Sequence, residues 1–409
     1  LALDLAADDD LGIRERSMAL VPLLTDGSDR SVASLKFHLD YRKSGIVARP
    51  GVLPHRAEEE RRRFAAHLLG FVEGHEVENA LWASVGATTR KADGERAFAV
   101  GALGRRKARD YQRELFRIAD DRQEDDQVRR AAVIGLGLMV APDDRESVDR
   151  LARQVRNERK DEIRRQFACM ALAEVGGARA LEQLLGMARD NVFASDDSRA
   201  FLWLALGLAG DKSPDARAFL LGEFRKARSA ATRAPLAVAL ALARHPEAGK
   251  EVRDAIGKTS LAGCAEFLAY GSLALGMLGA PGAGDTIREV LRKYADPEVK
   301  RQAAIGLALL ERAGALPDLL DLLENTGTNF TRAAVVTAFG LLRDPSPAIV
   351  DALVGTAFND RNDDSVRSRA ISALGALVDP REIAFSALLS RGYNYLVRCH
   401  ALDEIATWL

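Results

Sequence analysis

The segment DDQVRRAAVIGLGL (residues 125–138) recurs along most of the chain in a constant register. Three further copies are DEIRRQFACMALAE (161–174), DPEVKRQAAIGLAL (296–309) and DDSVRSRAISALGA (363–376). One column of the alignment is basic, with Leu268 filling it in one unit, and its members are Arg62, Arg96, Arg129, Arg165, Arg199, Arg233, Lys300, Arg332 and Arg367. Successive members of the column lie 32 to 36 residues apart. A period of this size indicates a repeat protein whose units pack on their neighbours.

The columns that follow the basic position predict a packed helical face. Six residues later stands glycine or alanine in every unit except that of Leu68, and seven residues later stands leucine or Phe339. Glycine or alanine follows again at the eighth position. The leucine shares one side of a helix with the third position, which makes that side the core stripe. The small residues allow another backbone to approach closely.

Helix starts are also marked in the repeat. Four residues before the basic column stand side chains that accept hydrogen bonds from free backbone amides: Asp125, Asp161, Ser195, Ser229, Asp296, Thr328 and Asp363. Such residues are preferred N-caps. Between these helices lie amphipathic segments such as 214–227 and 316–325. At ~1.5 Å per residue, a unit of this length holds two helices and short turns, which excludes a three-helix armadillo unit.

The capping aspartate followed by V-R-x-x-A and then A-L-G resembles the HEAT-repeat family, particularly the bacterial HEAT-like repeats of phycobilisome lyase-type proteins. The resemblance covers about residues 56–378 and implies an all-α, right-handed α-α superhelix of about ten to twelve two-helix repeats. It implies that the V-R helix lines the concave face. It also implies a structural ladder of arginine and aspartate between neighbouring units, formed by Arg129, Arg165, Arg199, Arg233, Lys300, Arg332 and Arg367.

Three regions are expected. Residues 1–55 form an N-terminal cap repeat with a loop insertion, residues 56–378 form the solenoid, and residues 379–409 form a C-terminal cap. The insertion falls in 42–56, whose glycines and prolines interrupt a helix. The chain begins at Leu1 without methionine, so an upstream leader is not ruled out. We expect a cytoplasmic protein and keep export as the alternative.

Charge and hydropathy narrow the classes of partner. The 58 basic and 59 acidic side chains nearly cancel, so no global field recruits nucleic acid or an anionic membrane. The basic run 104–113 is followed by an acidic run at 120–126, which indicates a salt-bridged face. A nucleic-acid contact at 104–113 is the alternative. No apolar run is long enough to span a membrane.

Motifs for chemistry are scarce. The cysteines Cys169, Cys264 and Cys399 lie far apart in apolar surroundings and are expected to be buried. HEAT-like deoxyhypusine hydroxylases hold two irons with several His-Glu dipeptides, whereas this sequence has one, His75-Glu76. We therefore expect no metal, no cofactor and no catalytic residue. A lyase-like accessory enzyme is an alternative that only the family resemblance suggests.

The centre of the repeat array is unusually apolar. The segments 198–210, 232–243 and 265–280 are apolar around nearly the whole helix circumference, although an open solenoid should keep one polar side. These side chains either fill the layer between paired helices or line a concave groove across units 165 to 280 that receives a partner. The groove residues under this hypothesis are Phe167, Phe201, Trp203 and Tyr270. We predict a non-enzymatic interaction scaffold that binds a protein or peptide on its concave face.

Overall fold

The structure is a computed structural model of the 409-residue chain, and it describes residues 33, 35–36, 62–63, 65–72, 74–87, 93–158, 160–210, 213–259, 264–310 and 313–378. The regular elements in these ranges are helices, as the repeat predicts, and the fold is an all-α solenoid of two-helix repeats. The expected C-terminal cap at 379–409 and the loop insertion at 42–56 lie outside the described residues. So does almost all of the expected cap repeat at 1–55.

The described residues divide into two compact units, with the division inside α12 after Gln183. The first unit contains α6 (His75–Ala87), α7 (Asp93–Arg105), η1 (Arg109–Tyr111), α8 (Gln112–Asp120), α9 (Asp126–Met139), α10 (Arg145–Asn157), α11 (Glu162–Val175) and most of α12 (Gly177–Arg189). The second unit contains α13 (Asp196–Ala209), α14 (Pro214–Lys226), α15 (Ala230–Leu242), α16 (Ala248–Gly257), α17 (Ala265–Leu278), α18 (Ala283–Lys293), α19 (Pro297–Leu310), η2 (Ala313–Ala315), α20 (Leu316–Asn325), α21 (Asn329–Leu342), α22 (Pro347–Phe358) and α23 (Asp364–Val378).

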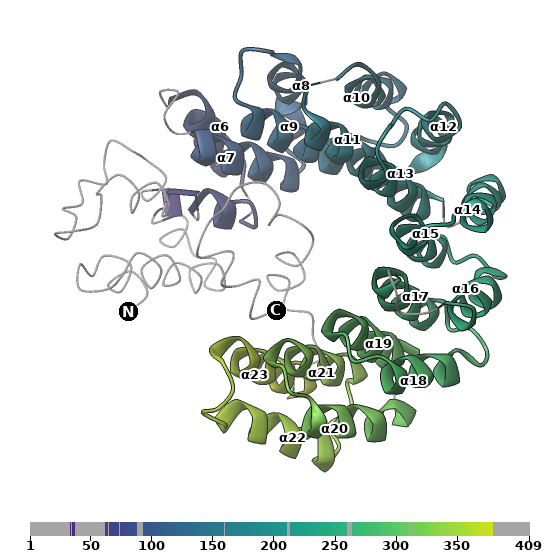
Figure 1. The fold of residues 1–409 in the computed structure, drawn as a ribbon. Helices are drawn as coiled ribbons and strands as arrows, with labels where there is room; N and C mark the ends of the chain where they lie inside the picture. The colour runs from purple at the N-terminus through teal and green to yellow at the C-terminus, as the bar shows by residue number, and fades with distance from the viewer. Residues whose placement is uncertain are drawn as a thin grey trace. The chain divides into compact units, whose positions relative to one another are not determined.

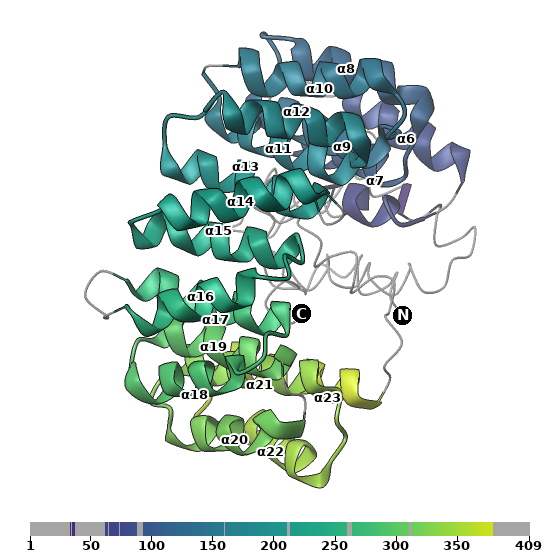
Figure 2. The same cartoon turned by 90° about the vertical axis from the view of Figure 1, so that its right-hand side faces the viewer.

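Within each unit the helices form two parallel rows (Figure 1). The helices that begin with the repeat segment form the row that we call the inner row, which is α7, α9 and α11 in the first unit and α13, α15, α17, α19, α21 and α23 in the second. The remaining α-helices form the outer row, and each of them except α12 packs against the inner helix that follows it within its own unit. Figure 2 shows the helices of the second unit stacked in one array from α13 to α22.

The predicted N-caps are present at every position. Asp125 accepts hydrogen bonds from the amides of Gln127 and Val128, and the other six caps likewise bond amides of their own first turns. The repeat that contains α17 lacks such a cap, because the side chain of Cys264 makes no hydrogen bond to the first turn of this helix. The cap column therefore fixes where most inner helices begin.

Small residues let neighbouring inner helices touch through their backbones. A Cβ atom built on Gly104 would lie 2.1 Å from the Cα of Gly135, and one built on Gly276 would lie 2.1 Å from the carbonyl oxygen of Gly306. In both pairs the eighth position of one repeat meets the sixth position of the next. The predicted close approach of neighbouring backbones is confirmed at these two pairs, because a side chain on Gly104 or Gly276 would overlap the neighbouring helix.

Candidate functional site

An exposed apolar surface crosses the inner row of the second unit. It consists of two columns, five and nine residues after the repeat's basic position, made of Leu204, Val238, Leu273 and Ile305 in one and Leu208, Leu242, Met277, Leu309 and Leu341 in the other. Leu208, Met277, Leu309 and Leu341 expose 38% to 45% of their surface, and the other members are half-buried. Since consecutive inner helices pack side by side, the columns join into one band, which we call the apolar stripe.

Helix geometry explains why the apolar stripe faces away from the core. With 3.6 residues per turn, the fifth and ninth positions lie roughly opposite the third and seventh, which hold buried residues such as Leu202 and Leu206 of α13. A helix that is paired on one side normally presents polar residues on the other. Contiguous exposed apolar surface of this kind marks an interaction site on a soluble protein.

A polar and aromatic cluster borders the apolar stripe at the beginnings of α17, α19 and α21. The guanidinium of Arg301 lies 4.9 Å from the ring centre of Phe330, and its Nη2 donates to Glu298 at 2.5 Å. Although burial opposes it, bonds from Arg301, Gln302 and Tyr270 hold the pKa of Glu298 below its usual value. Phe330 is 48% exposed, so this border offers an exposed aromatic ring beside Arg301, and arginine is one of the residue types that dominate binding energies.

The four aromatic residues predicted for the groove do not share one environment. Phe167 in the first unit, and Phe201 and Tyr270 in the second, are half-buried. Trp203 is only 4% exposed, so the prediction that it keeps appreciable exposure is wrong. The reason is its register, because Trp203 occupies the fourth position after the basic column. The fourth position faces the packed interior, as the buried Cys169 shows in its own repeat.

Four members of the arginine column bond their inner helix to the end of the preceding outer helix. The Nε atoms of Arg165, Arg233 and Arg367 donate to the backbone carbonyls of Val155, Ala227 and Ala357 at 2.8–3.0 Å. Arg332 donates from Nη2 to the carbonyl of Thr326 at 3.0 Å, Arg199 pairs with Asp196 in its own first turn, and Lys300 is half-buried. A cation at the last carbonyls of a helix complements the helix dipole.

The expected Arg–Asp ladder between neighbouring units is therefore wrong for Arg233, Arg332 and Arg367, whose bonds shown here stay within their own repeat. An ion pair between neighbouring repeats does occur one position later, where Arg130 forms a bidentate pair with Asp161 at 2.8–3.2 Å. Arg129 forms ion pairs with Glu158 of the next repeat at 3.5 Å and with Asp126 at 3.2 Å.

The basic run at 104–113 is partly used inside the first unit. Arg106 donates to Glu78 and to the carbonyl of Gly74, and the guanidinium of Arg105 lies 4.1 Å from the ring centre of Phe71. These contacts agree with a salt-bridged face. Two of the cations that a nucleic-acid contact at 104–113 would use, Arg105 and Arg106, are therefore already engaged within the protein.

Other predicted features concern metals, thiols and membranes. Within the described ranges no three His, Cys, Asp or Glu side chains gather as a metal site, and His75 lies 3.2 Å from Glu78. Cys169 is fully buried and burial raises the pKa of its thiol to about 12, Cys264 is half-buried, and Cys399 lies outside the described residues. In the described part of the chain, no helix has the length and apolar character needed to cross a membrane.

Comparison with known proteins identifies the repeat. Residues 122–205 and 284–375 match the family model described as HEAT repeats. These two segments of the all-α solenoid are therefore similar to HEAT repeats. The lyase-type subgroup that the sequence suggested stays a prediction. No curated protein matches the chain.

Two solved structures are among those that match the chain. Human deoxyhypusine hydroxylase in complex with glycerol is 15% identical, with 76% of this chain and 94% of that chain covered and a TM-score of 0.29. The Kap95p complex with RanGDP is 10% identical, with 100% of this chain and 60% of that chain covered and a TM-score of 0.40. Likeness at this level says nothing about the activity or partners of this chain.

Sequence reasoning missed the residues of the apolar stripe. It weighted aromatic residues two and four positions after the basic column, whereas the exposed side chains are aliphatic and lie five and nine positions after it. The signal was present in the alignment, since four of the five inner helices of the stripe carry an aliphatic residue at both positions. Only Thr337 of α21 interrupts the column of the fifth position.

Proposed function

We propose that the chain is a non-enzymatic binding scaffold and that the apolar stripe of the second unit receives a protein or peptide partner. One observation supports the proposal above all: five successive inner helices place nine apolar side chains, four exposed and five half-buried, on the side away from the core, and only Thr337 interrupts them. Keeping such a surface exposed to water is unfavourable, because burying apolar surface is worth ~25 cal/mol per Å². A partner that covers the stripe gains this free energy.

The spacing of the stripe favours an amphipathic helix as the bound element. Packed helices lie roughly 8–10 Å apart, so the stripe presents a group of apolar side chains at about that interval. A helix that repeats its apolar residues every seven positions advances ~10.5 Å per repeat, at 1.5 Å per residue. A helix laid across the inner row can therefore place one apolar group over each inner helix. Arg301 and Phe330 lie beside this path and can anchor one end.

A peptide-display selection against the full chain tests the proposal. Peptides are selected on the native protein, and their affinities are then measured for Met277→Lys, Leu309→Lys and the control Val354→Lys. Val354 is 40% exposed on the outer helix α22, so the control adds the same charge to an equally exposed apolar position. We expect amphipathic peptides to be enriched, and each stripe variant to weaken them tenfold or more, which corresponds to about 1.4 kcal/mol.

Two results would contradict the proposal. One is a selection that enriches no amphipathic sequence, and the other is equal weakening by the control and the stripe variants. A salt titration separates the nucleic-acid alternative, since phosphate contacts give affinities that fall steeply with salt concentration and apolar contacts do not.

A further inference from the structure

A charged cavity lies in the first unit. It has a volume of about 240 Å³ and opens where α8 and α10 end and α9 and α11 begin. Its charged lining consists of five arginines and two carboxylates, namely Arg122, Arg129, Arg150, Arg153, Arg164, Asp120 and Glu158. A concave site with this imbalance focuses a positive potential toward its interior.

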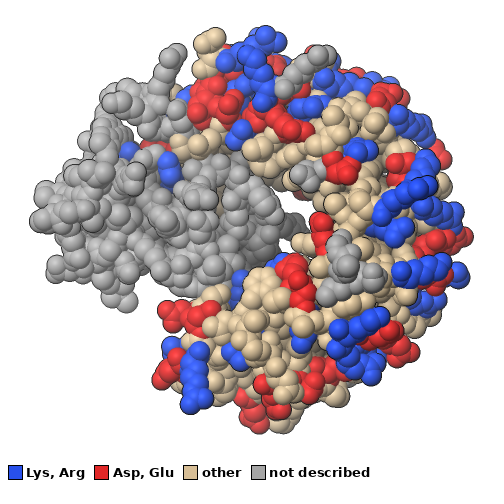
Figure 3. Space-filling view, viewed as in Figure 1, with Lys and Arg blue, Asp and Glu red and all other residues tan. Residues whose placement is uncertain are grey.

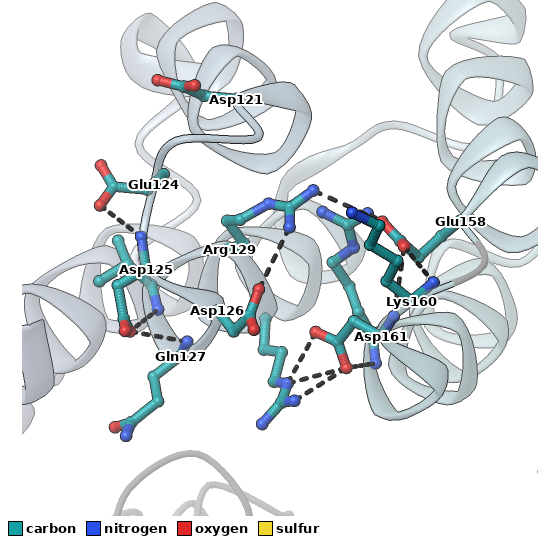
Figure 4. Close-up of polar contacts among 12 residues, drawn as sticks. Asp121, Glu124, Asp125, Asp126, Gln127, Arg129, Glu158, Lys160 and Asp161 are labelled. Carbon is teal, nitrogen blue, oxygen red and sulfur yellow. Dashed lines mark hydrogen bonds and ion pairs between the residues drawn. The ribbon is translucent and has the colours of Figure 1, made fainter.

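Two of the arginines are buried and share one half-buried carboxylate. Arg129 is 7% exposed and Arg164 is 3% exposed, and both contact Glu158. Arg129 also meets the exposed Asp126 at 3.2 Å, and Arg164 donates to the carbonyl of Ala119 at 2.9 Å. Figure 4 shows Arg129 and Glu158 facing each other between the two repeats.

The charge of this pair is not fully compensated. Burial, and next the charge of Arg129, lower the pKa of Arg164 to about 10. The Nε atoms of both arginines are buried and make no hydrogen bond within the described part of the chain. Buried charge without full compensation is costly, so an added anion would be stabilising here.

The rim of the cavity provides further donors. Arg150 and Gln154 both bond Asp120, which neutralises that carboxylate. Arg122 and Arg153 are exposed, and neither forms an ion pair with a described carboxylate. The rim therefore holds two guanidinium groups that can turn toward a bound ligand.

We propose that this cavity binds a phosphate group, either as a free phosphate ion or ester or on a phosphorylated side chain. Guanidinium groups match phosphate oxygens through paired N–H donors, and charge-assisted bonds of this type are stronger than neutral ones. Arg129 and Arg164 form the floor that the anion neutralises, and Arg122 and Arg153 close over it. The carboxylates do not block the site, because Asp120 is held by Arg150 and Glu158 by the buried arginines.

Binding is measured on the full chain with two probes at constant ionic strength. One is inorganic phosphate, followed by the thermal midpoint against matched chloride, and the other is a labelled phosphoserine peptide against its unphosphorylated form. We expect Arg122→Gln and Arg153→Gln each to weaken phosphate binding about tenfold, because each variant loses a charge-assisted hydrogen bond to the phosphate oxygens. Both positions are exposed, so the fold should be retained. Arg113→Gln removes the same charge from an exposed position of α8 outside the cavity and is the control.

The outcomes distinguish the source of the phosphate and the validity of the site. Tighter binding of the phosphopeptide than of the free ion identifies a phosphorylated partner, and similar binding identifies a small phosphate ligand. Two results overturn the proposal: phosphate stabilises the chain no more than chloride does and the phosphopeptide binds no better than its unphosphorylated form, or Arg113→Gln weakens binding as much as the cavity variants.

Discussion

Trp203 and Leu208 lie on the same helix, yet Trp203 is 4% exposed and Leu208 is 45% exposed. Their register in the repeat decides this difference, because the fourth position faces the interior and the ninth faces away from it. Residue type alone suggested the opposite, since large aromatic rings are common anchors of binding surfaces. The candidate site was predictable from column position and was missed where residue type was given more weight.

Replacing Trp203 should therefore affect stability and not binding. We expect Trp203→Ala to lower the free energy of unfolding of the second unit by roughly 3–5 kcal/mol, because a large buried ring leaves a cavity. Leu208→Ala should cost less than about 1 kcal/mol, since nearly half of its surface is already exposed. Chemical denaturation followed by circular dichroism measures both. A smaller loss for Trp203→Ala than for Leu208→Ala would contradict the register argument.

His67 should make the first unit sensitive to acid. Burial, and next the charge of Arg105, lower its pKa well below 6.5, while its ring packs edge-on against Phe71 and Phe98. The unfolded chain therefore binds a proton near pH 6.5 that the folded chain resists. The stability that depends on neutral His67 is complete above this pH and is lost as the pH falls below it.

The matched variant is His67→Phe, which keeps a ring and removes the titration. We expect the thermal midpoint of the native chain to fall more steeply than that of His67→Phe between pH 7.5 and pH 5. Identical pH profiles would show that His67 does not carry this sensitivity.

At the scale of the helix, the contact of inner helices through glycine explains the two columns of small residues. Gly276→Ala should destabilise the second unit by ~1–3 kcal/mol, because the new methyl group would overlap the backbone of Gly306. Gly222→Ala on α14 is the control, since a Cβ there meets nothing within 4 Å. Alanine at Gly222 should be neutral or stabilising by up to ~1 kcal/mol, and thermal denaturation compares the two. Equal effects would contradict close backbone packing.

Helix pairs, caps and small-residue columns could all be predicted, because each depends on residue types that recur at fixed positions of the repeat. The partners of the arginine column could not. Arg233 and Arg332 donate to backbone carbonyls, and every residue has a carbonyl, so the sequence carries no signal for that acceptor. The rung from Arg130 to Asp161 was missed for another reason. Asp161 was assigned to its own helix as a cap, and its carboxylate makes both contacts.

At the scale of the molecule, the repeat period predicted an all-α solenoid and composition excluded a strong overall charge. Figure 3 agrees with this balance, since Lys and Arg alternate with Asp and Glu over the outer helices of each unit. The apolar stripe could not be predicted from composition. It occupies one face of five helices in the second unit, and its few residues hardly alter the average composition of the chain. Whether a side chain is exposed follows from its position in the repeat together with the packing of the helices.

The central claim is that the apolar stripe contacts the partner, and site-specific photo-cross-linking tests it most directly. Benzoylphenylalanine is placed at the position of Leu309 on α19 or, as the control, of Val354 on α22, which are 43% and 40% exposed. Each protein is irradiated with the selected amphipathic peptide, and the attached peptide is quantified by mass spectrometry. We expect a strong cross-link at the position of Leu309 and little at that of Val354. Equal cross-linking at both positions, or cross-linking at that of Val354 alone, would contradict the account.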